Sequence, residues 1–143
     1  TAPAHSSTRT FTEELPMPIV ALYAALFAIM LVALSVRVIL VRQAKQVAIG
    51  DGGHTALQRA IRVQGNFTEY VPLALLLFWL VETSGAAALW VHGLCAALLL
   101  GRIVHAVGVS QIKETLAIRV VGMLLTFTSL LVGAGWVLVR AAM

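Results

Sequence analysis

Four long apolar segments follow one another along the chain, separated by short polar or glycine-rich stretches. They cover residues 17–41, 55–81, 86–109 and 116–140. Each is longer than the about 20 residues that an α-helix needs to cross the hydrocarbon core of a bilayer. The pattern therefore predicts an all-α integral membrane protein, in which residues 17–143 form one four-helix, four-span domain.

The segments outside these spans are short. Residues 82–85 leave room for only a tight connection, so we expect the second and third helices to form an antiparallel hairpin. Residues 1–16 are polar and lack the charged-then-apolar order of a signal peptide, which predicts a flexible N-terminal tail. Gly133, Ala134 and Gly135 near the end of the last span predict a close contact between helices.

The first half of the second span departs from this apolar pattern. Between residues 58 and 72 it carries Arg59, Arg62, Gln64, Asn66, Glu69 and Tyr70. Positions 59, 62, 66 and 69 are spaced by 3, 4 and 3 residues, which places two arginines, an amide and a carboxylate on one helical face. An ionisable side chain inside a bilayer costs on the order of 2.5 to 3.5 kcal/mol, so such groups usually face a bundle interior or a cavity. This stripe is the first candidate site.

Further polar groups lie in the last two spans. Arg102 and His105 are three residues apart and share a face, and Arg119 lies near the start of the fourth span. The charge distribution places them at the same end of the bundle as the stripe, because Lys and Arg flank the first and third connections and are absent from the second. By the positive-inside rule the first and third connections are cytoplasmic.

Composition narrows the class of protein. The chain has 143 residues, of which 60% are hydrophobic and 11% charged, and its mean hydropathy is +0.95. These values exclude a soluble basic domain. The net charge of +4 does not indicate a nucleic-acid partner, because the basic residues lie mostly at the ends of apolar segments. We expect membrane lipids to surround the protein.

Several familiar chemistries have no matching pattern in the sequence. Cys95 is the single cysteine, and the four histidines are not closely spaced, so we expect no disulfide within the chain and no metal site. There is also no GxxxxGK phosphate loop, HExxH zinc motif or GxSxG nucleophile turn. We expect Cys95 to be a small buried apolar residue.

The polar stripe suits a small anionic ligand that also carries an ammonium group. An arginine side chain can form two parallel hydrogen bonds with a carboxylate, and Glu69 could bind the ammonium group of the ligand. A guanidinium can also stabilise a thiolate, which favours thiol activation over general-base hydrolysis. The structural alternative is that Arg62 and Glu69 form a buried ion pair while Arg59 extends to the membrane interface.

The motif RxxRxQxNxxEYxP, from Arg59 to Pro72, resembles the second helix of the MAPEG family, the membrane-associated proteins in eicosanoid and glutathione metabolism. GRIVHAV at 101–107 and IRVV at 118–121 are similar to the third-helix and fourth-helix signatures of its prostaglandin E synthase branch. The likeness covers about residues 16–140, with the same pattern of connections.

The resemblance implies a homotrimer of four-helix protomers that bind glutathione between neighbouring subunits near the cytoplasmic side. Arg119 matches the arginine that stabilises the thiolate. The family positions that hold glutathione are matched by Arg62, Gln64, Asn66, Glu69 and Tyr70. Polar positions of the third helix are matched by Arg102 and His105, and a basic position at the end of the first helix by Arg42.

Three departures from the family pattern argue against eicosanoid synthesis. Val109 stands where eicosanoid members have a tyrosine, Met123 where an aromatic ring could pack on the ligand, and Gln43 where the leukotriene-forming enzyme has an arginine. The hypothesis is a bacterial-type inner-membrane protein that uses glutathione as co-substrate, transferring it to hydrophobic electrophiles or reducing lipid peroxides. The alternative is a non-catalytic subunit or scaffold of a larger membrane complex. A transporter is a weaker hypothesis, since no midplane charge pair or pair of broken helices is evident.

Overall fold

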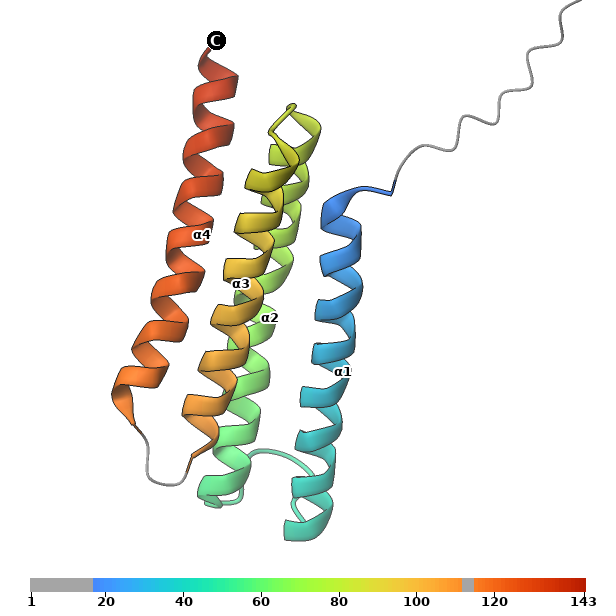
Figure 1. Cartoon of the computed structure of the whole chain (residues 1–143). Helices are drawn as coiled ribbons and strands as arrows, with labels where there is room; N and C mark the ends of the chain where they lie inside the picture. The colour runs from blue at the N-terminus through green and yellow to red at the C-terminus, as the bar shows by residue number, and fades with distance from the viewer. Residues whose placement is uncertain (1–16, 112–114) are drawn as a thin grey trace, which may run out of the picture.

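The computed structural model describes residues 17–111 and 115–143, which form four α-helices. These are α1 (Ile19–Lys45), α2 (Thr55–Thr83), α3 (Ala88–Ser110) and α4 (Leu116–Ala142). Successive helices run in opposite directions, so the α1–α2 connection lies at the same end of the bundle as the end of α3 and the start of α4, and the α2–α3 connection lies at the other (Figure 1). The prediction of four helices is confirmed, with the largest difference at the end of α1. The tail predicted for residues 1–16 lies outside the described residues.

Three of the helices, α1, α3 and α4, are long and apolar enough to cross a membrane. Their outer faces carry apolar side chains such as Ile29 (69% exposed) and Leu131 (73% exposed), a surface suited to lipid. α2 has 29 residues but is not among these candidates. Its arginines and Glu69 lower the hydropathy of a helix that is otherwise apolar, and that α2 also spans the membrane stays a prediction.

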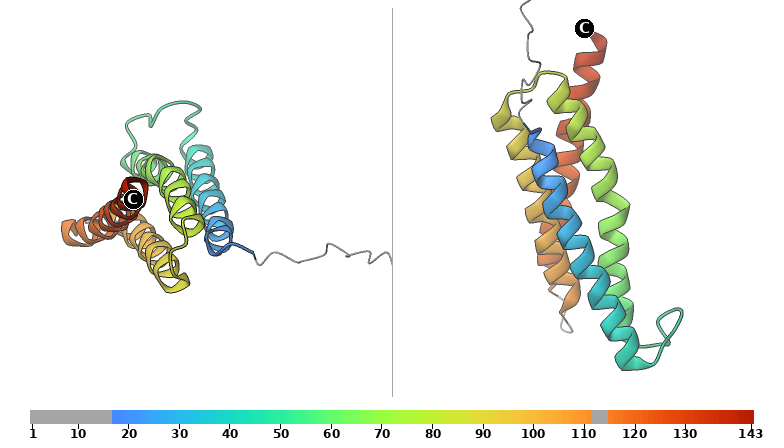
Figure 2. Two further views of the ribbon diagram at one scale, coloured as in Figure 1. Left: turned by 90° about the horizontal axis from the view of Figure 1, so that it is seen from above. Right: turned by 90° about the vertical axis from the view of Figure 1, so that its right-hand side faces the viewer.

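The packing of the helices is uneven. α1 packs against α2 and α3, whereas α4 packs against α3 and α2 and has no contact with α1 in the described part of the chain. Seen from above, α4 is inclined to the other three helices (Figure 2). The core between α1, α2 and α3 contains Phe27, Phe78 and Leu98, and Cys95 is fully buried in it, as expected.

Glycines set the closest approaches of α4. A Cβ atom on Gly122 would lie 2.6 Å from the backbone nitrogen of His105 and 2.8 Å from the carbonyl oxygen of Gly101, so α3 and α4 cross here almost backbone to backbone. The predicted contact near Gly133 is confirmed, because a Cβ there would lie 3.0 Å from the ring of Phe78 on α2. Gly135, by contrast, has nothing within 4 Å of such an atom.

The end of α2 also caps α1. Pro18 precedes α1 and offers no side-chain cap, so the first N–H groups of the helix need acceptors from elsewhere. Glu82 supplies them: its Oε1 accepts from the backbone N–H of Ile19 at 2.6 Å and its Oε2 from that of Val20 at 3.0 Å. A carboxylate at this position also favours the positive end of the helix dipole. The cap fixes α1 against the α2–α3 hairpin.

Candidate ligand-binding site

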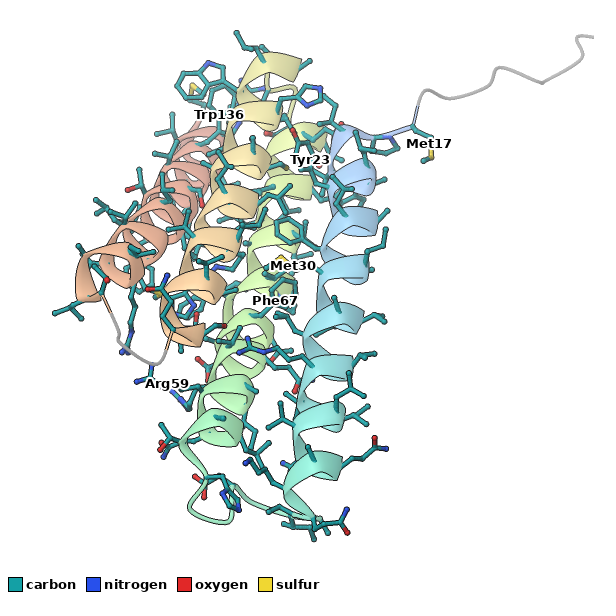
Figure 3. The ribbon with its side chains drawn as sticks, turned by 60° about the horizontal axis from the view of Figure 1, so that its bottom comes forward. Met17, Tyr23, Met30, Arg59, Phe67 and Trp136 are labelled. Carbon is teal, nitrogen blue, oxygen red and sulfur yellow. The ribbon has the colours of Figure 1, made fainter. Side chains whose placement is uncertain are left out.

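A polar cavity of about 350 Å³ lies toward the end of the bundle where the α1–α2 connection is found. Figure 3 shows Arg59 at this end, with Trp136 at the opposite end. The described residues that line the cavity come from three helices: Thr55, Gln58, Arg59, Arg62 and Asn66 of α2, His105 and Val109 of α3, and Arg119 of α4. The α2 positions are spaced by 3, 1, 3 and 4 residues and form one face, so the predicted stripe does line a cavity.

The charge of the cavity is strongly positive. Its described lining includes three arginines and no carboxylate. Guanidinium groups stay protonated at any physiological pH and present several donors in a plane, a geometry that matches carboxylates and phosphates. Amide and hydroxyl groups of Gln58, Asn66 and Thr55 add neutral hydrogen-bonding capacity. The cavity is therefore suited to an anionic ligand of small size.

Arg59 links the cavity to the end of α3. Its Nη1 donates to the backbone carbonyl oxygen of Val109 at 3.0 Å. Val109 lies in the last turn of α3, where carbonyl groups lack partners within the helix and where the dipole favours a cation. Arg59 therefore holds α2 to α3 while forming part of the cavity wall.

Arg102 lies behind the cavity and is almost completely buried, with 2% of its surface exposed. Its Nη1 donates to Oδ1 of Asn66 on α2 at 2.5 Å, and its Nη2 donates to Oγ1 of Thr126 on α4 at 2.7 Å. Because a guanidinium can only donate, Asn66 must present its oxygen to Arg102. The NH₂ group of Asn66 is thereby left for an acceptor in the cavity that Asn66 lines.

Tyr70 belongs to the same buried cluster. The centre of its ring lies 5.6 Å from Cζ of Arg102, within the range of a cation–π contact, and it meets Phe127 edge to face at 5.5 Å. Nε of Arg102 is buried without a hydrogen-bond partner in the described residues. Arg102 and Tyr70 are therefore not part of the cavity lining, and Arg102 is connected to it through its hydrogen bond with Asn66.

The structure brings together some of the residues singled out from the sequence. Arg62, Asn66, His105 and Arg119 line one cavity, with Arg102 and Tyr70 directly behind it. His105 is buried, whereas Arg62 and Arg119 are exposed. No ion pair joins Arg62 to Glu69 in the described part of the chain, and Glu69 is exposed one turn beyond Asn66.

Two other candidates lie elsewhere in the structure. Gln64 is two positions from both Arg62 and Asn66, which on a helix is the opposite side, and its Nε2 donates to Oγ of Ser35 on α1 at 2.8 Å. Arg42 donates to the carbonyl oxygen of Gly50 at 2.7 Å and so holds the α1–α2 connection. Their role in ligand binding stays a prediction.

The sequence pattern did not predict three residues found at the site, Thr55, Gln58 and Thr126. The first two extend the polar stripe backward at helical spacing, which is a usable signal. Thr126 gives no such signal, because its contact with Arg102 depends on how α4 crosses α3. No group of three or more metal-ligating side chains is found in residues 17–111 and 115–143.

These features define an all-α membrane protein with a cationic cavity among α2, α3 and α4. The chain belongs to the MAPEG family, whose sequence pattern matches residues 20–139. It is 44% identical over 88 residues to the inner membrane protein YecN of Escherichia coli strain K12, which is 62% of this chain and 67% of the relative. YecN of Escherichia coli O6:H1 strain CFT073 matches to the same extent. No solved structure matches.

Proposed function

We propose that the protein is a glutathione-dependent transferase or peroxidase that acts on hydrophobic electrophiles in the inner membrane. The observation that carries this proposal is the cationic cavity, which is lined by Arg62 and Asn66 of α2 and by Arg119 of α4. Membership of the MAPEG family supports glutathione as the co-substrate. The relative's name as an inner membrane protein supports the location. The charge pattern supports a cytoplasmic position for the cavity.

Glutathione fits the residues that are present. It has two carboxylates, one ammonium group and one thiol, and a cavity of about 350 Å³ is within the usual size of small-ligand sites. Arg62 offers a fork of N–H donors to a carboxylate, and the NH₂ group of Asn66 offers another donor. Glu69, one turn further along α2, offers a carboxylate to the ammonium group.

Arg119 is the group best placed to stabilise a thiolate, because it lies on α4, across the cavity from the α2 face that offers donors to carboxylates. In a transfer reaction the thiol proton leaves to water, the sulfur forms a bond to an electrophilic carbon, and the leaving group departs with the bonding electrons. In peroxide reduction the thiolate attacks the peroxide oxygen, and a second glutathione completes the disulfide while alcohol and water are released. Both reactions need the thiolate that the guanidinium favours.

The position of Glu69 supports an oligomer. It lies 14 residues after Thr55, which at 1.5 Å per residue is about 21 Å along α2, and it is exposed in the isolated protomer. A carboxylate facing lipid at this depth costs several kcal/mol. A neighbouring subunit or a ligand at its interface removes that cost.

A second candidate function is a non-catalytic subunit or scaffold of a larger membrane complex. Two observations favour it. Val109 gives the cavity an apolar wall where a hydroxyl could have contacted a thiol. The sulfur of Met123 lies 3.4 Å from Nη2 of Arg102, so this side chain serves the buried cluster and not a ligand.

A conjugation assay distinguishes the two candidates. Purified protein in detergent is given glutathione and an activated aryl chloride such as chlorodinitrobenzene, or a lipid hydroperoxide. We expect turnover in the wild-type protein, a decrease in kcat of about a hundredfold in Arg119→Ala with little change in KM, and partial activity in Arg119→Lys. Lys45→Ala, which removes an exposed cation outside the cavity, is the matched control and should retain full activity. Full activity in Arg119→Ala would contradict the assigned role, and no turnover of either substrate would favour the scaffold.

A further inference from the structure

A second cavity lies at the opposite end of the bundle, near the α2–α3 connection. It has a volume of about 410 Å³ and is lined mainly by apolar side chains of α3 and α4, among them Leu94, Val132 and Val139. Trp90 and Trp136 lie at its wall and Arg140 completes it. Figure 3 shows Trp136 at the end of the bundle away from Arg59, so this cavity is separate from the cationic one.

One residue holds both polar groups of this second cavity in place. Nε1 of Trp136 donates to Oγ of Ser84 at 2.9 Å, and Nη2 of Arg140 donates to the backbone carbonyl oxygen of the same residue, also at 2.9 Å. Ser84 follows the last turn of α2. The indole ring and the guanidinium are thus fixed relative to each other, and the apolar space is open because Gly135 has no side chain to fill it.

No acidic side chain within residues 17–111 and 115–143 pairs with Arg140, and Glu82, at the same end of the bundle, uses both oxygens to cap α1. Arg140 lies in the last turn of α4, where a cation is favoured by the helix dipole. That accounts for a basic residue at this position. It does not account for an apolar cavity directly beside it, or for a tryptophan hydrogen-bonded at the same point.

Along the membrane normal, the charged and apolar groups of this cavity follow the same order as the headgroup and acyl chain of a lipid. Tryptophan side chains prefer the level of the lipid headgroups, so two of them at this end place the mouth of the cavity at that level. An apolar space with a cation at its mouth fits an acyl chain below an anionic headgroup. We propose that this cavity is a binding site for an anionic membrane phospholipid, with an acyl chain between α3 and α4 and the headgroup phosphate at Arg140.

A phospholipid fits better than a second copy of the chain. A helix docking here would need an acidic side chain opposite Arg140 at the same depth, and the described carboxylate at this end is already engaged by α1. An anionic phospholipid needs no such partner, because its phosphate supplies the negative charge and its acyl chain the apolar contact. The leaflet concerned is the one that faces the α2–α3 connection.

Tryptophan quenching by brominated lipids tests the proposal in the full-length protein. Trp79 on the exposed face of α2 is first replaced by phenylalanine, so that both remaining tryptophans line the cavity. The protein is reconstituted in phosphatidylcholine vesicles that contain increasing fractions of chain-brominated phosphatidylglycerol or chain-brominated phosphatidylcholine. We expect half-maximal quenching at an about fivefold lower mole fraction of the anionic lipid.

Variants of Arg140 separate a site from ordinary lipid contact. Arg140→Gln should abolish the preference for the anionic lipid, and Arg140→Lys should keep most of it because the charge remains. Lys45→Gln, which removes a last-turn cation at the other end of the bundle, should leave the preference unchanged. Equal quenching by the two lipids, or the same preference in Arg140→Gln, overturns the proposal. So does protection of both tryptophans from either lipid, the result expected if another protein chain covers the cavity.

Discussion

Replacing Gly122 with alanine tests the packing that places the cationic cavity between α3 and α4. The added Cβ would lie 2.6 Å from the backbone nitrogen of His105, 2.8 Å from its Cβ and 2.8 Å from the carbonyl oxygen of Gly101. None of these atoms can rotate away, so the two helices must separate. Overpacking of this kind costs about 1–3 kcal/mol. Alanine recovers about 0.5–1 kcal/mol of that through its better helix propensity.

We therefore expect Gly122→Ala to lower the free energy of unfolding by up to about 2.5 kcal/mol, the overpacking cost less the gain in propensity. Ligand binding at the cationic cavity should weaken as well, because His105 touches the added methyl group and Arg119 lies one turn from Gly122 on α4. The free energy of unfolding is measured by denaturant titration in mixed micelles. Gly93→Ala on α3 is the matched control: nothing lies within 4 Å of the new atom, so it should be neutral or stabilising. If Gly122→Ala is as stable as Gly93→Ala, the two helices do not cross as closely as described.

Two further substitutions test contacts between helices. Arg102→Met removes two interhelical hydrogen bonds, each worth about 0.6–1.7 kcal/mol in a membrane protein. It should therefore destabilise the fold by about 1–3 kcal/mol in the same titration. The control is the neighbouring Ile103→Ala, on the lipid-facing side, which should have a smaller effect. Glu82→Ala leaves the N–H groups of Ile19 and Val20 without their acceptor and should cost about 0.5–2 kcal/mol, with faster amide hydrogen exchange confined to the first turn of α1. Unchanged exchange there would mean that the cap is not formed in solution.

Helical periodicity was sufficient to predict the four helices and the face of α2 that lines the cavity. Positions 59, 62 and 66 share that face through local geometry alone, so their spacing in the sequence identifies them as neighbours. The same reasoning separates Gln64 from them, although the family motif groups it with its neighbours. Its contact with Ser35 agrees with the spacing.

The direction of Arg102 could not be predicted in this way. Its spacing from His105 places both on one face of α3, but His105 lines the cavity while Arg102 turns to Asn66 and Thr126. Which way a long side chain turns depends on what the neighbouring helices offer at that height. That in turn depends on the close crossing of α3 and α4 at Gly122, a contact between residues distant in sequence.

The cavity at the other end was also not evident from the sequence. Trp90, Trp136 and Arg140 are far apart along the chain or separated by a full helical turn, and each alone is typical of a membrane interface. Ser84 joins two of them only because the start of the α2–α3 connection lies beside the last turns of α4. Sequence spacing carries no information about such a junction.

The measurement that tests glutathione binding most directly is a thermal-unfolding titration of the detergent-purified protein with reduced glutathione. A ligand that binds only the folded state should stabilise it by about 2.7 kcal/mol at roughly a hundred times its dissociation constant, which gives a clear increase in Tm. We expect a saturable increase in the wild-type protein and in Lys45→Ala, and its loss in Arg62→Ala and Glu69→Ala. No increase up to millimolar glutathione, or an equal increase in Arg62→Ala, would contradict glutathione binding at the cationic cavity.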